Sequence, residues 1–172
     1  SEETVKVDST TLTQPFGASL IALPALALGA SFSRMGGNAN EVATDPDQTF
    51  HVTTSVASSD VIVGGTGQDT LILSSSADAT NLLYNISGIE KIKIANSGTK
   101  ILVGDGLVAS GQSIIIDASE ITNNVGLNFD GTAETNGDFI ISGSKNDDTI
   151  VGGQTPNSDF ISGNEGNDSL FG

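Results

Sequence analysis

Several residue types are missing or scarce in this chain of 172 residues, which has no cysteine, no tryptophan and only 6 basic residues. The absence of cysteine excludes disulfide cross-links and thiol redox chemistry. The 21 acidic residues give a formal net charge of -15, which repels phosphate backbones, so we expect no nucleic-acid partner. Solubility in a saline medium is one reason for such a charge, and neutralisation by divalent cations is another.

Long amphipathic helical periods are also missing. Apolar residues form short β-branched runs separated by Gly, Asn, Ser, Asp and Thr, and the chain contains 21 glycines. These runs recur at intervals of roughly 8 to 13 residues between 92 and 141, with turn residues between them. In Lys91, Ile92, Lys93 and Ile94, apolar and charged side chains alternate as they do on a half-exposed strand. The pattern predicts an all-β fold with many tight turns.

One segment has a strict glycine pattern. Residues 64–72 read GGTGQDTLI and match the nonapeptide G-G-x-G-x-D-x-U-x, in which U is a large aliphatic residue, at each defined position. Its glycines leave backbone carbonyls free to converge on a hard cation, and the three residues after the aspartate form a short strand. Asp60 lies nine positions before Asp69 and is followed by the same x-aliphatic-x pattern. The segment predicts calcium binding.

A second, less regular array lies near the C-terminus. Its aspartates are 10, 11 and 9 residues apart, and each stands two residues before an aliphatic residue that we expect to point inward: Ile140, Ile150, Ile161 or Leu170. The longest interval contains Pro156, which lengthens the turn and leaves the strand phase intact. Across both arrays the candidate metal-site residues are Asp60, Asp69, Asp138, Asp148, Asp159, Asp168, Gly64, Gly65, Gly67, Gly143, Gly152, Gly153, Gly163 and Gly166.

These repeats resemble those of the RTX (repeats-in-toxin) proteins that bacteria export. The resemblance implies a parallel β-solenoid, or β-roll, in which two nonapeptides complete one coil and aspartates two repeats apart share a calcium ion. It pairs Asp138 with Asp159 and Asp148 with Asp168, and leaves the partners of Asp60 and Asp69 open. The runs between the two arrays are interpreted as larger coils of the same solenoid with a single narrow core.

Residues 1–51 differ from the rest and are predicted as a separate N-terminal segment. The stretch 16–32 has no charge, but Pro24 and two glycines interrupt it and acidic residues precede it, so we expect neither a membrane span nor a signal peptide. A buried cap and a docking surface are two interpretations. Residues 34–49 are predicted as a loop. The solenoid is expected over 52–172, with repeats at about 57–73 and 136–172.

No catalytic residues are expected. The only histidine is His51, and the sequence has no nucleophile elbow and no metalloprotease helix motif. Asp147 and Asp148 are adjacent acids of the kind that sugar-processing enzymes use in pairs, but Asp148 already occupies the ligand position of a repeat. Structural calcium explains the carboxylates more simply.

The resemblance implies a non-enzymatic, calcium-dependent structural module of a secreted bacterial surface protein of the surface-layer or adhesin type. Such a module would leave the cell by type I secretion, lie extracellularly at the cell surface, and fold and assemble on binding calcium. Its expected partners are calcium ions, other copies or neighbouring domains, and a cell-surface glycan. The alternative is an accessory or secretion module of a secreted carbohydrate-active or other enzyme.

Overall fold

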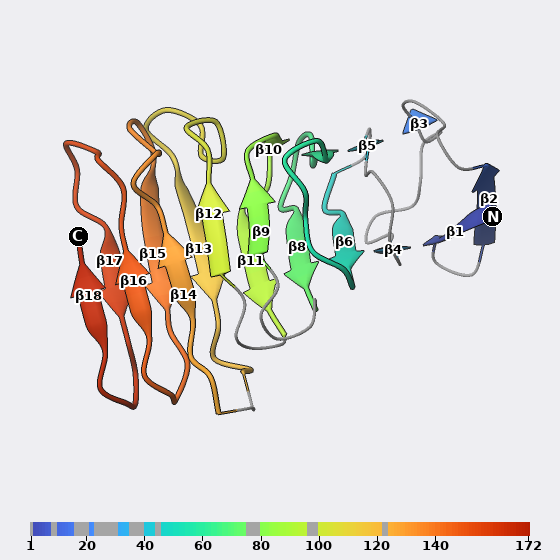
Figure 1. Cartoon of the computed structure of the whole chain (residues 1–172). Helices are drawn as coiled ribbons and strands as arrows, with labels where there is room; N and C mark the ends of the chain where they lie inside the picture. Colours follow the sequence, from blue (N-terminus) through green and yellow to red (C-terminus); the bar gives the residue numbers. More distant parts are fainter. Residues whose placement is uncertain are drawn as a thin grey trace.

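The computed structural model describes residues 2–7, 10–15, 21–22, 31–34, 40–43, 46–74, 80–95, 100–121 and 124–172. Within these ranges the chain forms strands and no helix, and the strands follow one another along a single axis (Figure 1). An antiparallel pair opens the chain, made by β1 (Glu2–Val7) and β2 (Thr10–Pro15). The other strands pair in parallel in three sheets, which we call sheets I, II and III.

Sheet I has four strands: β3 (Ile21–Ala22), β5 (Asn40–Val42), β7 (Val61–Val63) and β10 (Ile86–Ser87). Sheet II has seven: β4 (Ser31–Arg34), β6 (Thr49–Val52), β8 (Thr70–Leu73), β11 (Lys91–Ile94), β13 (Ser113–Asp117), β15 (Asp138–Ser142) and β17 (Phe160–Ser162). Sheet III has five: β9 (Thr80–Leu83), β12 (Lys100–Val103), β14 (Asn128–Asp130), β16 (Thr149–Val151) and β18 (Ser169–Phe171). The predicted parallel β-solenoid is therefore confirmed.

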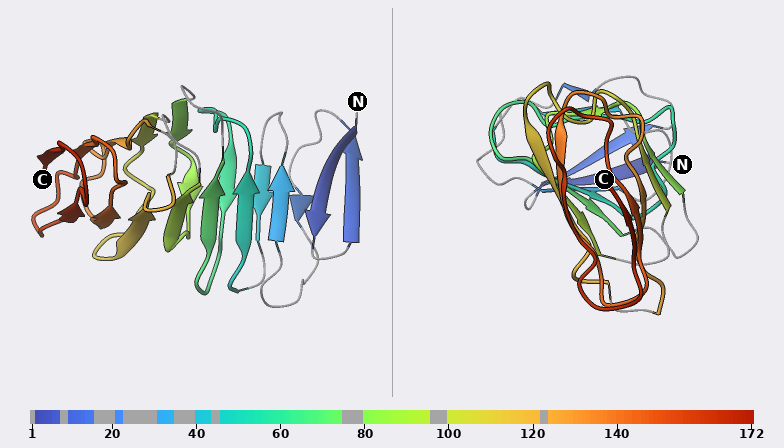
Figure 2. Two further views of the ribbon diagram at one scale, coloured as in Figure 1. Left: turned by 90° about the horizontal axis from the view of Figure 1, so that it is seen from below. Right: turned by 90° about the vertical axis from the view of Figure 1, so that its left-hand side faces the viewer.

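The coil changes shape along the axis. From β7 to β12 the chain visits sheets I, II and III in turn, whereas after β12 the described strands alternate between sheets II and III only. Seen along the axis, the last coils form a narrow, elongated outline (Figure 2). The glycine-rich turn at 64–69 therefore connects a strand of sheet I to a strand of sheet II. The turns at 143–148 and 163–168 instead connect sheet II to sheet III.

The core is one continuous column of aliphatic and aromatic side chains inside the coils. Ile92 and Ile94 of β11 are buried, and Lys91 and Lys93 face outward, where Lys91 Nζ lies 3.0 Å from Asp117 Oδ2. The predicted alternation in this strand is thus confirmed. Each fully buried aliphatic side chain contributes roughly 1.5–3 kcal/mol of transfer free energy, so stacked coils stabilise one another although each has only short strands.

The repeat at Asp138 has a different phase from the one that the nonapeptide spacing predicts. Ile140, expected inside, is 42% exposed, while its neighbour Phe139 is fully buried. The ring of Phe139 packs edge-on against Phe129, with 5.1 Å between centroids. Because side chains alternate along a strand, burying the large aromatic at 139 forces Ile140 outward. The prediction for Ile140 was wrong.

The parallel pairing continues upstream of residue 52. Strand β5 pairs with β3 and β7, so part of the stretch predicted as a loop at 34–49 is a strand. Strand β4 likewise pairs with β6. Of the apolar stretch 16–32, only 21–22 and 31–32 lie in the described residues, so the predicted cap or docking surface falls mostly outside them.

None of the described residues forms a helix long and apolar enough to cross a membrane.

Replacing Phe139 by Ala should lower the free energy of unfolding by about 3–5 kcal/mol, because a buried aromatic is lost and a cavity remains. Ile140→Ala is the matched control and should cost less than about 1 kcal/mol, since its side chain faces solvent. Urea denaturation followed by circular dichroism measures both. A larger loss for Ile140→Ala than for Phe139→Ala would refute the strand phase described above.

Candidate metal centres

Five carboxylates point along the solenoid axis and connect successive coils. Each accepts a hydrogen bond from the backbone N–H of a residue 20 or 21 positions earlier, on the preceding coil, at 2.6–2.9 Å. The pairs of acceptor and donor residue are Asp69 with Gln48, Glu90 with Asp69, Asp148 with Leu127, Asp159 with Phe139, and Asp168 with Asp148. Charge-assisted bonds of this kind are stronger than neutral ones. The acidic side chains thus act between coils.

The first glycine of each turn makes room for the carboxylate. A Cβ atom on Gly143 would lie 2.2 Å from Asp148 Oδ2, and one on Gly163 would lie 1.9 Å from Asp168 Oδ2. In the longer turn, a Cβ atom on Gly152 would lie 2.2 Å from Asp159 Oδ2. These distances are far inside van der Waals contact, so a carboxylate in this position requires glycine at the start of the turn.

Other turn glycines are needed for their backbone conformation. Gly65, Gly67 and Gly166 have φ of 96°, 114° and 120°, which residues with a Cβ rarely adopt. Gly153 instead donates its N–H to Asp159 Oδ2 at 2.6 Å. Together the turn glycines allow the backbone to approach the carboxylates closely.

The C-terminal array is aligned as predicted for one aspartate pair and not for the other. Asp148 and Asp168 stack in register, because Thr149 pairs with Ser169. Asp159, however, is aligned with Phe139 rather than with Asp138, whose carboxylate accepts from Thr155 Oγ1 at 2.9 Å instead. The one-residue offset follows from the burial of Phe139.

Hydrogen bonds hold both carboxylate oxygens of the buried Asp148 and of the half-buried Asp159. Asp148 Oδ1 accepts from Leu127 N and Ser144 Oγ, and Oδ2 accepts from Ser144 N. Asp159 uses Oδ1 for Phe139 N and Oδ2 for Gly153 N. Asp60 is also buried, but its Oδ2 bonds locally to Ala57 N, as in an ordinary turn.

Asp69 has a different environment. Its carboxylate is fully buried, Oδ1 accepts from Gln48 N at 2.6 Å, and Oδ2 has no hydrogen-bond partner. Burial raises the pKa of Asp69 to about 6, with smaller contributions from the charges of Glu90 and Asp47. The sequence left the partners of Asp69 open, and the structure supplies Gln48 and Glu90, each 21 residues away. That equal spacing is a signal in the sequence, although neither residue belongs to a nonapeptide.

The chemistry of these turns fits a hard cation. In the described part of the chain no three His, Cys, Asp or Glu side chains come together around one point, so a metal here must also use backbone and amide oxygens. Such oxygens are present, since Gly88 O lies 1.8 Å from where a Cβ of Gly64 would be, and Gly163 O lies 2.8 Å from that of Gly143. Carbonyl and carboxylate oxygens in flexible loops are the ligands that calcium prefers.

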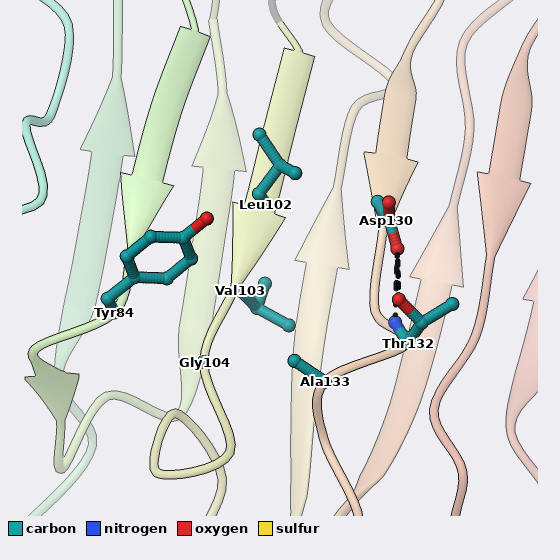
Figure 3. A pocket seen from close by; sticks show the side chains of 7 residues that line it. All are labelled: Tyr84, Leu102, Val103, Gly104, Asp130, Thr132 and Ala133. Carbon is teal, nitrogen blue, oxygen red and sulfur yellow. Dashed lines mark hydrogen bonds between the residues drawn. The ribbon is translucent and has the colours of Figure 1, made fainter.

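A shallow depression of about 380 Å³ lies on the outer surface beside sheet III, between Tyr84 and the turn after β14 (Figure 3). Its acid, Asp130, accepts from Thr132 Oγ1 at 2.7 Å and from Thr132 N, and these bonds hold the pKa of Asp130 below its ordinary value. A general acid for sugar cleavage needs a raised pKa. The lowered pKa does not suit Asp130 to the role of a general acid.

The only histidine is placed on sheet II. His51 Nε2 lies 2.5 Å from Ser74 Oγ, so the two side chains link adjacent coils. The ring is partly buried, and His51 is not among the residues that line the depression at Tyr84.

Gly143→Ala should lower the free energy of unfolding by about 1–3 kcal/mol, because the added methyl displaces the Asp148 carboxylate and leaves buried donors unpaired. Gly106→Ala is the control, since nothing lies within 4 Å of its Cβ position, and it should change stability by less than about 1 kcal/mol. Urea denaturation measures both variants. Equal effects would contradict the described packing of glycine against carboxylate.

In calcium-free buffer, Asp69 should make stability fall as pH rises from about 4 to about 6. The folded pKa of about 6 is above the ordinary 3.8, so the folded state holds the proton more tightly, and this advantage is lost as pH rises through the folded pKa. Asp69→Asn should remove a difference on the order of 2 kcal/mol. The measurement is denaturation of both proteins between pH 4 and pH 7. Parallel pH profiles would contradict the raised pKa.

Comparison with known proteins agrees with this geometry. A family model described as the RTX calcium-binding nonapeptide repeat (4 copies) matches residues 56–79 and 155–172. No curated protein and no solved structure gives a match. The matched ranges include the turns of Asp69, Asp159 and Asp168. Two stretches of the parallel β-solenoid therefore match the RTX calcium-binding nonapeptide repeat, and these repeats imply that the chain binds calcium.

Proposed function

We propose that this chain is a non-enzymatic module of an extracellular bacterial surface protein, and that calcium completes its fold and enables its assembly. One observation carries the proposal: Asp148 and Asp168 stack in register on successive coils, each beside a glycine that leaves room for its carboxylate. Backbone carbonyls approach the same turns. Calcium held there would bridge the coils. The ligands we propose for the repeats are the candidate aspartates and the carbonyls of their turn glycines.

Electrostatic repulsion among the acidic residues of the C-terminal repeats is the reason that a bound calcium ion would stabilise the fold. Six acidic residues lie between 138 and 168, and Lys145 is the only basic residue among them. Stacking carboxylates on successive coils brings like charges together, and the glycine-rich turns lose much conformational entropy on folding. A divalent cation offsets both costs, because binding to the folded coil alone adds its binding free energy to stability.

Calcium dependence also supports an extracellular location for this chain. Weak extracellular calcium sites operate at about 10⁻⁴–10⁻³ M, whereas sites of that strength stay largely empty at cytosolic calcium levels. A chain that remains loosely folded inside the cell suits export by type I secretion, and it would then fold on meeting external calcium. The absence of cysteine leaves metal ions and backbone ladders as the available cross-links.

Assembly with a neighbouring copy or domain is supported by an apolar row on the outer face of sheet II. Ile115, Ile140 and Phe160 are aligned on three adjacent strands and are 42%, 42% and 68% exposed. Contiguous exposed apolar side chains mark interaction surfaces more often than isolated ones do. The depression at Tyr84 offers a separate surface for a glycan.

The test is calcium-dependent stability. At a calcium concentration about 100 times the dissociation constant, the free energy of unfolding should rise by about 2.7 kcal/mol per site, while magnesium at equal concentration should have a smaller effect. Asp148→Asn should reduce this gain. Asp147→Asn removes the same charge one residue away, from an exposed side chain, and should retain the gain. Denaturation with calcium, with magnesium and with chelator measures all three proteins.

Two results would overturn the proposal. One is a stability that does not respond to calcium in the unaltered chain. The other is an equal loss of the calcium response in Asp147→Asn and Asp148→Asn, which would indicate a general charge effect and not ligation at the stacked turn.

A further inference from the structure

We propose that Gln48, which lies outside the nonapeptide repeats, is a side-chain ligand of a divalent-cation site that it shares with Asp69, with Glu90 on the next coil adding negative charge. This inference rests on the calcium-dependent function proposed above and goes beyond it. It assigns a ligand from a coil that carries no repeat. The three residues occupy equivalent positions on three successive coils, immediately before β6, β8 and β11.

Two buried oxygen atoms at this place lack partners. They are Gln48 Oε1 and Asp69 Oδ2, on residues that are 1% and 0% exposed. A buried acceptor without a donor destabilises the folded state. Both belong to residues joined directly by the bond from Gln48 N to Asp69 Oδ1 at 2.6 Å. A cation bound between them would satisfy both oxygens together.

The orientation of the Gln48 amide is fixed by its other end. Its Nε2 donates to Pro46 O at 3.0 Å. Turning the amide over would place Oε1 against that carbonyl, where two acceptors would repel each other. The oxygen of the amide is therefore the atom that remains unpartnered, and an oxygen is what a hard cation requires.

Negative charge gathers around this pair of oxygens. Glu90 Oε2 accepts from Asp69 N at 2.7 Å, and Asp47 Oδ1 accepts from the N–H of Gln68, the residue before Asp69, at 2.7 Å. The two lysines of β11 are directed elsewhere, since Lys91 pairs with Asp117 and Lys93 with Glu120. A divalent cation would balance carboxylates that these lysines do not reach.

Backbone geometry adds carbonyl oxygen to the same turn. Gly88 O approaches Gly64 so closely that a Cβ there would lie 1.8 Å from it, while the same Cβ would be 2.7 Å from Asp69 Cβ. The carbonyl of the later coil and the side chain of Asp69 thus meet at one glycine. An amide, carboxylates and a carbonyl form an all-oxygen set, which selects calcium over zinc or copper.

The experiment is isothermal titration of the full chain with calcium chloride. Gln48→Leu keeps the size of the side chain and removes Oε1, so we expect one ion fewer, or one site weakened at least about tenfold, a change of about 1.4 kcal/mol. Gln48→Glu supplies a carboxylate oxygen in place of the amide oxygen and should bind calcium at this site at least as tightly as the unaltered chain. Gln68→Leu is the matched control, because its exposed side chain bonds only to Gly67 O of the same turn.

The outcomes separate this inference from the proposed function. If Gln48→Leu binds the same number of ions with the same affinities as the unaltered chain while Asp148→Asn is impaired, the Gln48 ligand is refuted and the calcium-dependent function stands. If the unaltered chain binds no calcium, both are refuted. If Gln48→Leu loses its β signal in circular dichroism, the Gln48→Glu variant decides the question. A folded Gln48→Glu variant that binds calcium more weakly than the unaltered chain would also refute Gln48 as a ligand.

Discussion

The bond from a side-chain carboxylate to a backbone N–H of the preceding coil is the interaction on which the acidic turns of this solenoid depend. It needs an acidic side chain that points inward and a glycine whose lack of a Cβ atom leaves room for the carboxylate. It also needs coils of nearly equal length, so that successive turns stack. The nonapeptide meets the first two conditions by itself. Stacking at 20 or 21 residues meets the third. The glycine pattern is therefore a packing requirement as well as a conformational one.

Two positions between the arrays replace this interaction with apolar packing. Leu127 and Phe139 take the positions that Asp148 and Asp159 occupy on the next coils, and both are buried. Apolar residues at these positions need no counter-charge and contribute directly to the core. Apolar side chains thus replace the carboxylate at some turns, whereas the buried Glu134 still accepts a hydrogen bond from Val108 N of the preceding coil at 3.1 Å.

Much of the fold could be predicted because the strand periods and the glycine turns agree with each other. The alternation around Ile92 and the aspartate spacing both lead to short parallel strands, and the structure confirms them. The phase at Asp138 could not be predicted, because it depends on the contact of Phe139 with Phe129, a residue of another sheet. Gln48 and Glu90 were missed since their turns lack glycine patterns, although their 21-residue spacing from Asp69 is visible in the sequence.

The number of hydrogen bonds to each buried carboxylate indicates how strongly its turn depends on a bound metal ion. An ionised carboxylate has about four lone-pair sites. Asp148 accepts three hydrogen bonds, so protein donors compensate most of its charge. Asp69 is equally buried, yet one of its oxygens has no donor and Glu90 lies beside it. Because a buried charge without partners is more costly than a buried charge with them, calcium should contribute more to folding at the turn of Asp69 than at that of Asp148. The folding of the repeat at Asp69 should then depend more strongly on calcium than the folding of the C-terminal repeats.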